Sequence, residues 1–283
     1  MIGKIKILKP GILSSIQDKG RFGFSKFGVP RSGAMDQKSY ALANFLLGND
    51  QDDACIEWVF QSPVLEFSEP TIISLTGAEA NFYLNDKKIK MNRRIRVDKK
   101  DVLSSGFCKK NMYGYVGIKN GLITQEALSS KSYYKSITDQ YVLHKNDEIT
   151  YHKIAVFENH FSNISVPNFI ENKGKLKVYK GAEFDQLSET QKQVLLNTNF
   201  TISNTINRMA IQLEEKLDND LPSILTSAVL PGTIQLTPSG KLIVLMRDCQ
   251  TTGGYPRVLQ LTEDAINNIA QKRMKDKCSF ELL

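Results

Sequence analysis

The stretch TIISLTGAEANFYLNDKKIKMNRRIRV, residues 71–97, decides the fold class. It consists of short apolar or alternating runs separated by turn residues, and Asn85-Asp86 has the composition of a tight hairpin turn. Short strands this close together favour a β-barrel or β-sandwich over a parallel α/β sheet. The predicted strands here and in the flanking sequence are Cys55–Phe60, Thr71–Leu75, Asn81–Leu84, Lys87–Lys90, Arg94–Val97 and Tyr113–Ile118.

One helix is predicted before these strands, over Asp36–Leu47. Leu42, Phe45 and Leu46 are expected on its buried face because they are spaced three and four residues apart. Gly48 stands where a left-handed C-terminal cap belongs. The glycine-rich segment before the helix predicts a shaped loop.

The second half of the chain repeats this mixture of strands and helices. Ser188 and Gln191 have the spacing of a capping box before a helix at Glu189–Leu196, and Thr262 is the expected cap of a helix at Glu263–Gln271. The predicted strands are Leu176–Tyr179, Thr233–Leu236, Leu242–Met246 and Ser279–Leu283.

Two domains are expected in a chain of 283 residues. Periodicity is lost over Glu158–Lys175, where Asn, Ser and Gly accumulate, and this segment is the predicted linker. The predicted domains are therefore residues 1–160 and 174–283.

Composition argues for a soluble globular protein. Hydrophobic residues make up 41% and charged residues 24%, which argues against disorder and a coiled coil. No apolar run is long enough for a transmembrane helix, and lysines interrupt the N-terminal residues, so we expect no signal peptide and no membrane association. The four cysteines form no CxxC pair, which indicates reduced thiols and a cytoplasmic location.

The positive net charge of +7 does not by itself indicate a nucleic-acid-binding protein. The densest basic run, residues 86–101, alternates with apolar residues and has no interleaved aromatic residues, so we interpret it as the solvated face of strands. The histidines at 144, 152 and 160 lie too far apart for one strand, and no metal site is predicted. Phosphate-binding loops of the GxxxxGK[ST] and GxGxxG types are absent, as are HExxH, GxSxG and kinase motifs.

The strongest candidate for a functional segment is LMRDCQTTGGYPR, residues 245–257. Its paired glycines could adopt positive φ and expose N–H groups as an anion nest, and its Thr and Gln side chains could bind a carboxylate or an amide. The alternative is a plain hairpin with a Gly-Gly turn.

Three further segments offer polar groups in suggestive places. Gln235 follows the Pro231-Gly232 turn in an apolar strand, with an outward-facing Gln as the alternative. Arg208 lies in a run that also contains the β-branched Ile206 and the apolar Met209, as an arginine facing a cleft or one on a surface strand would. A third cluster precedes the first helix and suits either an anion site or loop salt bridges around a helix cap; it contains Asp18, Arg21, Arg31, Ser32 and Asp36.

Two long segments carry a family resemblance. IQDKGRFGFSKFGVPRSGAMDQ and VLPGTIQLTPSGKLIVLMRDCQTTGGYP resemble the two signatures of the family known as the C-type subunit of 5-oxoprolinase, allophanate hydrolase subunit 2 or biotin-dependent carboxyltransferase. Their order and spacing also agree, so the resemblance covers essentially the whole chain. It implies a mostly β fold of two linked cyclophilin-like β-barrel domains.

The resemblance also implies a function. It implies a hydrolase subunit of an ATP-dependent 5-oxoprolinase, which converts 5-oxo-L-proline, ATP and water to L-glutamate, ADP and phosphate. The implied partners are a B-type sister subunit and an A-type subunit, without which the chain is expected to be inactive. ATP, with or without Mg²⁺, is the implied cofactor, bound by this chain or jointly with its partner. Two alternatives are a carboxyltransferase component that acts on urea or another amide with a separate biotin protein, and a regulatory protein that binds a kinase inhibitor.

Site roles follow from the matching positions. Catalytic roles are expected for Arg208, Asp248 and Gln250, with Asp248 as a general base or as an orienter of a metal-bound phosphate. Substrate binding is expected for Arg21, Asp36, Gln235, Thr251, Thr252, Gly253, Gly254 and Tyr255.

The chain has Ile206-Asn207-Arg208-Met209-Ala210-Ile211 where members of the family commonly have S-D-R-M-G-Y. It has Asn207, Ala210 and Ile211 where relatives commonly have Asp, Gly and an aromatic residue. If that Asp holds a metal or a proton in the family, this chain has lost the group. If that aromatic residue stacks on a ring, Ile211 cannot do so equally well.

Overall fold

A computed structural model describes residues 2–154 and 175–283, and these residues fall into two compact units. The first unit contains the described residues up to 154 except Phe22–Arg31, and the second contains Phe22–Arg31 and the described residues from 175 onward. The predicted linker, Glu158–Lys175, lies outside the described residues except for Lys175. Phe22–Arg31 was expected in the N-terminal domain, but it groups with the second unit. Its only regular element is a 3-10 turn, η1 (Ser25–Phe27), so it has no strand that could join a sheet of the first unit.

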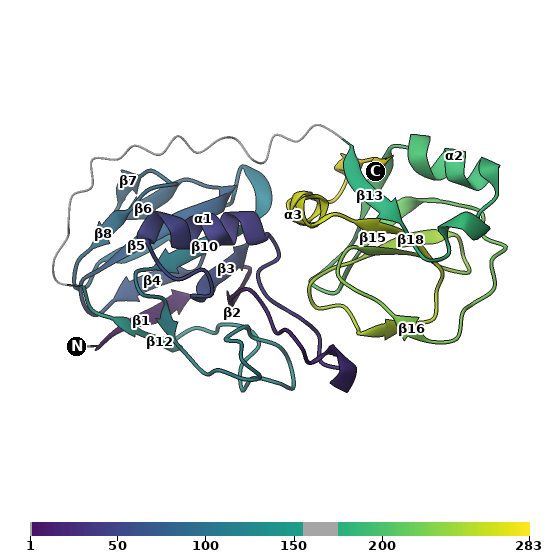
Figure 1. Cartoon of the computed structure of the whole chain (residues 1–283). Coiled ribbons are helices and arrows are strands. Elements are labelled where there is room, and N and C mark those ends of the chain that lie inside the picture. The colour runs from purple at the N-terminus through teal and green to yellow at the C-terminus, as the bar shows by residue number, and fades with distance from the viewer. Residues whose placement is uncertain (1, 155–174) are drawn as a thin grey trace. The chain divides into compact units, whose positions relative to one another are not determined.

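The first unit is built from two antiparallel sheets (Figure 1). Within the described residues, one sheet has the strand order β11 (Leu122–Ile123), β12 (Glu148–His152), β1 (Ile2–Lys9), β4 (Val64–Phe67), β9 (Val102–Ser105), β6 (Phe82–Leu84) and β7 (Lys87–Ile89). The other has the order β2 (Leu13–Gln17), β3 (Cys55–Val59), β10 (Lys110–Ile118), β5 (Thr71–Glu79) and β8 (Ile95–Val97).

Aromatic side chains fill the core of the first unit. Trp58 is fully buried and meets Phe82 edge to face, with ring centroids 5.9 Å apart. Gly114 lies beneath the indole of Trp58, and a Cβ at this position would lie 2.1 Å from its Cζ2 atom. Glycine at 114 is therefore required for the tryptophan to pack against strand β10.

The helix of the first unit, α1 (Gln37–Leu47), packs on β5 and β10 (Figure 1). Gly48 caps its C-terminus with φ +62°, as predicted. Asp36, which was predicted as the first residue of the helix, is its N-terminal cap. The predicted buried face was only partly right, because Phe45 is 65% exposed. Tyr40 and Leu47 are buried instead of Phe45, so the face of α1 toward the sheet is shifted by about one residue from the predicted face.

The second unit is organised around one large sheet. Its strand order in the described residues is β21 (Lys277–Cys278), β14 (Phe200–Ile206), β15 (Ala210–Lys216), β18 (Lys241–Leu245), β17 (Thr233–Leu236), β20 (Arg257–Leu261), β13 (Leu176–Lys180) and β22 (Phe280–Leu282). The pairs are antiparallel except for β13 with β22. A small ribbon pairs β16 (Ser227–Ala228) with β19 (Thr252–Gly253).

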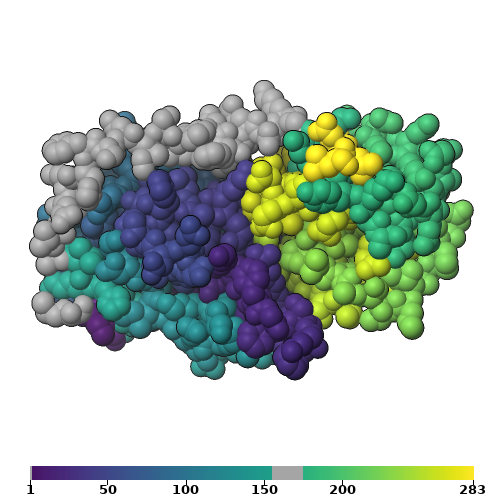
Figure 2. Space-filling view, in the orientation of Figure 1, coloured from purple at the N-terminus to yellow at the C-terminus, as the bar shows by residue number. Residues whose placement is uncertain are grey.

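Two helices flank this sheet. A 3-10 turn, η2 (Phe184–Gln186), precedes α2 (Glu189–Asn197), which has the predicted capping box. Only Leu195 of α2 is buried, and the helix lies on the surface (Figure 2). The other helix, α3 (Glu263–Ala270), is capped by Thr262 as predicted and packs on β13 and β20.

The mostly β fold class predicted from the sequence is confirmed. The hairpin between β6 and β7 turns at Asn85 and Asp86, which both have positive φ, as a tight turn between twisted strands requires. The four cysteines are buried free thiols.

Candidate functional site

The candidate site of the second unit is assembled by strand pairing. Ala210, at the start of β15, pairs with Leu245, at the end of β18. This register places the β14–β15 turn, which carries Arg208, beside the segment that follows β18, which carries Asp248. A backbone hydrogen bond holds these two segments together, since the N–H of Asp248 donates to the carbonyl of Arg208 at 2.9 Å.

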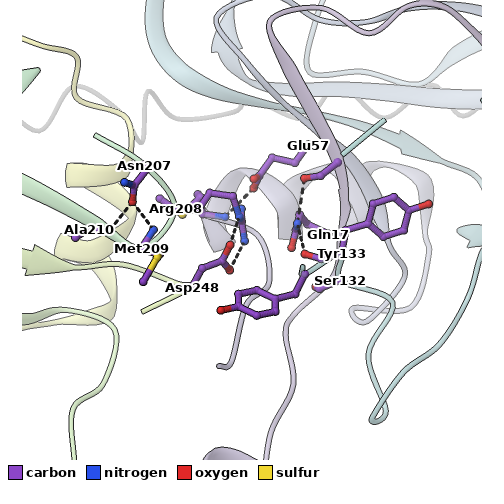
Figure 3. A network of polar contacts seen from close by, with 12 residues as sticks. Gln17, Glu57, Ser132, Tyr133, Asn207, Arg208, Met209, Ala210 and Asp248 are labelled. Atoms are coloured by element: carbon purple, nitrogen blue, oxygen red, sulfur yellow. Dashed lines mark hydrogen bonds and ion pairs between the residues drawn. The ribbon is translucent and has the colours of Figure 1, made fainter. Parts of the chain in front are cut away.

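Arg208 and Asp248 form a two-point ion pair (Figure 3). The Nε of Arg208 lies 2.8 Å from Oδ2 of Asp248, and its Nη2 lies 3.0 Å from Oδ1. The side chains are only 13% and 11% exposed, so the pair is largely shielded from water. Two parallel charge-assisted hydrogen bonds fix the carboxylate plane as well as its position. A reaction that uses Asp248 as a base has to loosen this ion pair.

Asn207 shapes the turn that presents Arg208 (Figure 3). Its Oδ1 accepts the N–H groups of Met209 and Ala210 at 2.8 and 2.9 Å. An aspartate carboxylate would accept the same two bonds, so Asn at this position preserves the turn. Ile211 is fully buried in the sheet, which makes that departure from the family pattern a change in the core.

The segment with the paired glycines is a short strand and not an anion nest. Neither Gly253 nor Gly254 has a left-handed φ, so the expected positive-φ turn is wrong. Thr252 and Gly253 instead form β19, which pairs with β16. A further backbone hydrogen bond holds this segment, because the carbonyl of Thr251 accepts the N–H of Val229.

Gly253 is needed for a different reason, which is the close approach of Gln235. A Cβ on Gly253 would lie 2.7 Å from Nε2 of Gln235. Gln235 is 2% exposed and donates from Nε2 to the carbonyl of Tyr255 at 3.4 Å. Gln235 therefore does not face outward, because its side chain is buried against Gly253 and bonds to the backbone of Tyr255.

Three polar side chains of this segment keep their hydrogen-bonding capacity. Gln250 and Thr252 are exposed and Thr251 is partly buried. Across residues 2–154 and 175–283, none of the three side chains has a hydrogen bond to another residue. Tyr255 is 40% exposed beside them. An amide, two hydroxyls and a phenol thus lie along a backbone that strand pairing holds in place.

Arg257 anchors the far end of this segment. It donates from Nε and Nη2 to the carboxylate of Glu183, at 3.0 and 2.8 Å, and from Nη1 to the carbonyl of Ala228. These hydrogen bonds lower the pKa of Glu183 and raise that of Arg257. Sequence reasoning missed this pair, because Glu183 and Arg257 are far apart in the chain and Glu183 lies outside the segments that the sequence singled out.

The predicted binding residues of the first unit serve local structure. Arg21 donates to the carbonyls of Ala127 and Ser132 and is buried. Asp36 accepts the N–H groups of Lys38 and Ser39 as the cap of α1. Their assignment to substrate binding stays a prediction.

Sequence reasoning also missed a buried polar network in the first unit. Glu57 accepts a hydrogen bond from the hydroxyl of Tyr115 at 2.8 Å and another from the N–H of Met35 at 2.7 Å. Burial raises the pKa of Tyr115, so its hydroxyl keeps the proton that it donates. A glutamate within the otherwise apolar strand β3 was the one available signal.

No metal centre or membrane span is found in the described part of the chain. Among residues 2–154 and 175–283, no three His, Cys, Asp or Glu side chains gather as metal ligands would. None of the described helices combines the length and apolar character needed to cross a bilayer.

Known proteins match the sequence over very different shares of the chain. The C-type subunit of 5-oxoprolinase from Haemophilus influenzae is 27% identical over 98% of this chain and 90% of its own length. Urea amidolyase of Lachancea kluyveri is 37% identical over 45% of this chain, a region that amounts to 7% of that enzyme.

Solved structures share the fold. TTHA0988 superposes with a TM-score of 0.85 at 21% identity, and urea amidolyase of K. lactis with a TM-score of 0.86 at 23% identity. Each match covers 99% of this chain, which spans 56% of the first protein's chain and 19% of the second's. The family model described as "carboxyltransferase domain, subdomain A and B" matches residues 27–282. The chain therefore belongs to the family of carboxyltransferase domains with subdomains A and B.

Proposed function

We propose that the chain is the C-type subunit of an ATP-dependent 5-oxoprolinase that works with a B-type sister subunit. The observation that carries the proposal is the match to the C-type 5-oxoprolinase subunit of Haemophilus influenzae along 98% of this chain and 90% of that protein. The match to urea amidolyase covers less than half of the chain. A sequence match that extends over both domains supports the role of a C-type subunit more strongly than one confined to a part, whereas the fold, which urea amidolyase shares along 99% of the chain, does not separate the two functions.

The chemistry of the candidate site suits a cyclic amide. A lactam presents one carbonyl acceptor and one N–H donor, and the amide of Gln250 and the hydroxyls of Thr251 and Thr252 can pair with both. Arg208, held by Asp248, supplies positive charge beside them. These groups bind and orient a substrate and stabilise developing negative charge, and they need no covalent nucleophile.

In this proposal ATP is a co-substrate that makes the lactam carbonyl electrophilic by phosphorylation, after which water opens the ring. Asp248 acts as the base for that water once its pairing with Arg208 loosens. The described residues do not fit a dedicated Mg²⁺ site, because the one carboxylate at the candidate site is paired with Arg208. No step is assigned to a metal held by this chain alone.

The test is ADP release by the chain co-expressed with its B-type and A-type subunits, with and without 5-oxoproline. We expect 5-oxoproline to stimulate ADP release and Gln250→Ala to lower kcat roughly 100-fold, the scale of losing one stabilising donor. Gln193→Ala is the matched control, since Gln193 is exposed on α2. No stimulation by 5-oxoproline refutes the function, and an unchanged kcat in Gln250→Ala refutes the site.

A second function, a carboxyltransferase component with a separate biotin protein, is favoured by the 37% identity to urea amidolyase. It predicts carboxyl transfer to an amide that avidin blocks. The 5-oxoprolinase reaction is insensitive to avidin, so one addition separates the two functions.

A further inference from the structure

We propose that Arg31 and Arg247, both in the second unit, form a binding site for a small carboxylate anion. This inference does not depend on the proposed function. The sequence singled out Arg31 with Arg21 as a pair suited to an anion, but Arg21 is committed to two carbonyls of the first unit. Arg31 instead belongs to the second unit, where Arg247 is its cationic neighbour.

Arg247 is buried with part of its donor set unused. Its side chain is 0% exposed. Nη1 lies 3.2 Å from Oε2 of Glu263, and Nη2 donates to Oε1 of Glu263 and, at 3.1 Å, to Oδ1 of Asn267. Its Nε is buried and has no hydrogen-bond partner among the residues that the structure describes. An unpaired buried N–H of a charged group is costly, so this atom points to an acceptor supplied from outside the chain.

Arg31 has no anionic partner of its own among the described residues. The Cζ atom of its guanidinium lies over the ring of Phe22, 4.2 Å from the centroid, and this contact leaves its positive charge uncompensated. Its Nε is also buried without a partner, and the described residues give it no ion pair. Burial and the charge of Arg247 lower the pKa of Arg31, and Glu263 opposes them only in part.

The charges of this cluster do not balance. Arg31 and Arg247 carry two positive charges, and Glu263 supplies one negative charge to both. One positive charge remains uncompensated beside the fully buried Arg247, and an unpaired charge is costly where water is excluded. A singly charged anion restores neutrality and supplies acceptors for the two unpaired Nε–H groups.

The geometry favours a carboxylate over a phosphate. A carboxylate is singly charged at neutral pH, and its two oxygens match the fork of a guanidinium. The ring of Phe22 gives the site an apolar flank, which suits the carbon skeleton of an organic acid. The expected ligand class is therefore a small monocarboxylic acid.

The test uses the full chain and sodium acetate as the probe. The side-chain Nε–Hε signals are followed by ¹H–¹⁵N NMR while acetate replaces chloride at constant ionic strength. We expect saturable shifts in two signals, those that disappear in Arg31→Gln and in Arg247→Gln. Arg31→Gln should weaken acetate binding at least 10-fold. Arg96→Gln is the matched control and should leave binding unchanged, because Arg96 forms an exposed pair with Asp98.

Three results would overturn the inference. These are the absence of a saturable acetate shift, an affinity unchanged in Arg31→Gln, and saturation by inorganic phosphate where acetate fails. If Arg247→Gln does not fold, Arg31→Gln still decides the matter, because Arg31 is only partly buried and makes no ion pair in the described chain.

Discussion

Asn207 shows how one uncharged side chain positions a charged one. Its Oδ1 holds two consecutive N–H groups, and the turn so formed presents Arg208 to Asp248. The usual aspartate of the family and the asparagine of this chain share the acceptor that the turn needs. The substitution therefore alters the charge near Arg208 more than it alters the backbone.

Replacement of Asn207 by leucine should destabilise the protein and misplace Arg208. Two N–H groups lose their acceptor, and at about 0.5–1.5 kcal/mol for each hydrogen bond the free energy of unfolding should fall by roughly 1–3 kcal/mol. Urea denaturation measures the change. Asn207→Asp is the control and should retain most of the stability; equal losses in both variants would contradict the role given to Oδ1.

Gly253 should tolerate even a methyl group poorly. In Gly253→Ala the new Cβ would lie 2.7 Å from Nε2 of Gln235, so we expect a loss of about 1–3 kcal/mol from overpacking. Gly254→Ala is the control, since its nearest neighbour would lie 3.3 Å away.

A double-mutant cycle with Gln235→Ala isolates the cause of that loss. Shortening Gln235 removes the clash, so the two changes together should cost less than the sum of their separate effects. Strict additivity would show that the glycine is required for some other reason.

At the scale of elements, the β16–β19 ribbon is held to the large sheet by Arg257 at the start of β20. Arg257 binds both Glu183, at the N-terminal cap of η2, and the carbonyl of Ala228 in β16. The pair stiffens the backbone that carries Gln250, Thr251 and Thr252.

The contribution of this pair should depend on pH. Arg257 lowers the pKa of Glu183 from its ordinary value of 4.5, so the stabilisation is fully present above pH 4.5 and is lost as the pH falls through the lowered pKa. Glu183→Gln should therefore cost about 1–3 kcal/mol at pH 7, the scale of a hydrogen bond to a charged group, and progressively less below pH 4.5.

Unfolding free energies measured by urea denaturation across this pH range check the expectation. Glu189→Gln is the control, because Glu189 is 82% exposed and its pairing with Lys192 should contribute little. A cost for Glu183→Gln that does not change with pH would contradict the assigned ion pair.

Elements with local signals were predictable from the sequence. The C-terminal cap of α1, the N-terminal caps of α2 and α3 and the turn at Asn85-Asp86 each depend on a few adjacent residues, and all were found where expected. The exposed position of Phe45 was not predictable, because the direction in which a helix faces is set by the sheet beneath it.

At the scale of the whole molecule, contacts between residues far apart in the chain could not be predicted from the sequence. Two mostly β halves follow from strand patterns alone, but the pairing of Arg208 with Asp248 depends on the register of β15 with β18. The grouping of Phe22–Arg31 with the second unit likewise has no local signature. The Thr-Thr-Gly-Gly segment was recognised as a candidate site, whereas the close approach of Gln235 that explains its first glycine required the structure.

The most direct test of the central claim is the ratio of L-glutamate to ADP formed from 5-oxo-L-proline by the purified complex of this chain with its A-type and B-type subunits, with avidin present. The account predicts one glutamate for each ADP, and no product when this chain is omitted. Glutamate formation that proceeds at the full rate without this chain, or carboxylated product that avidin abolishes, would contradict it.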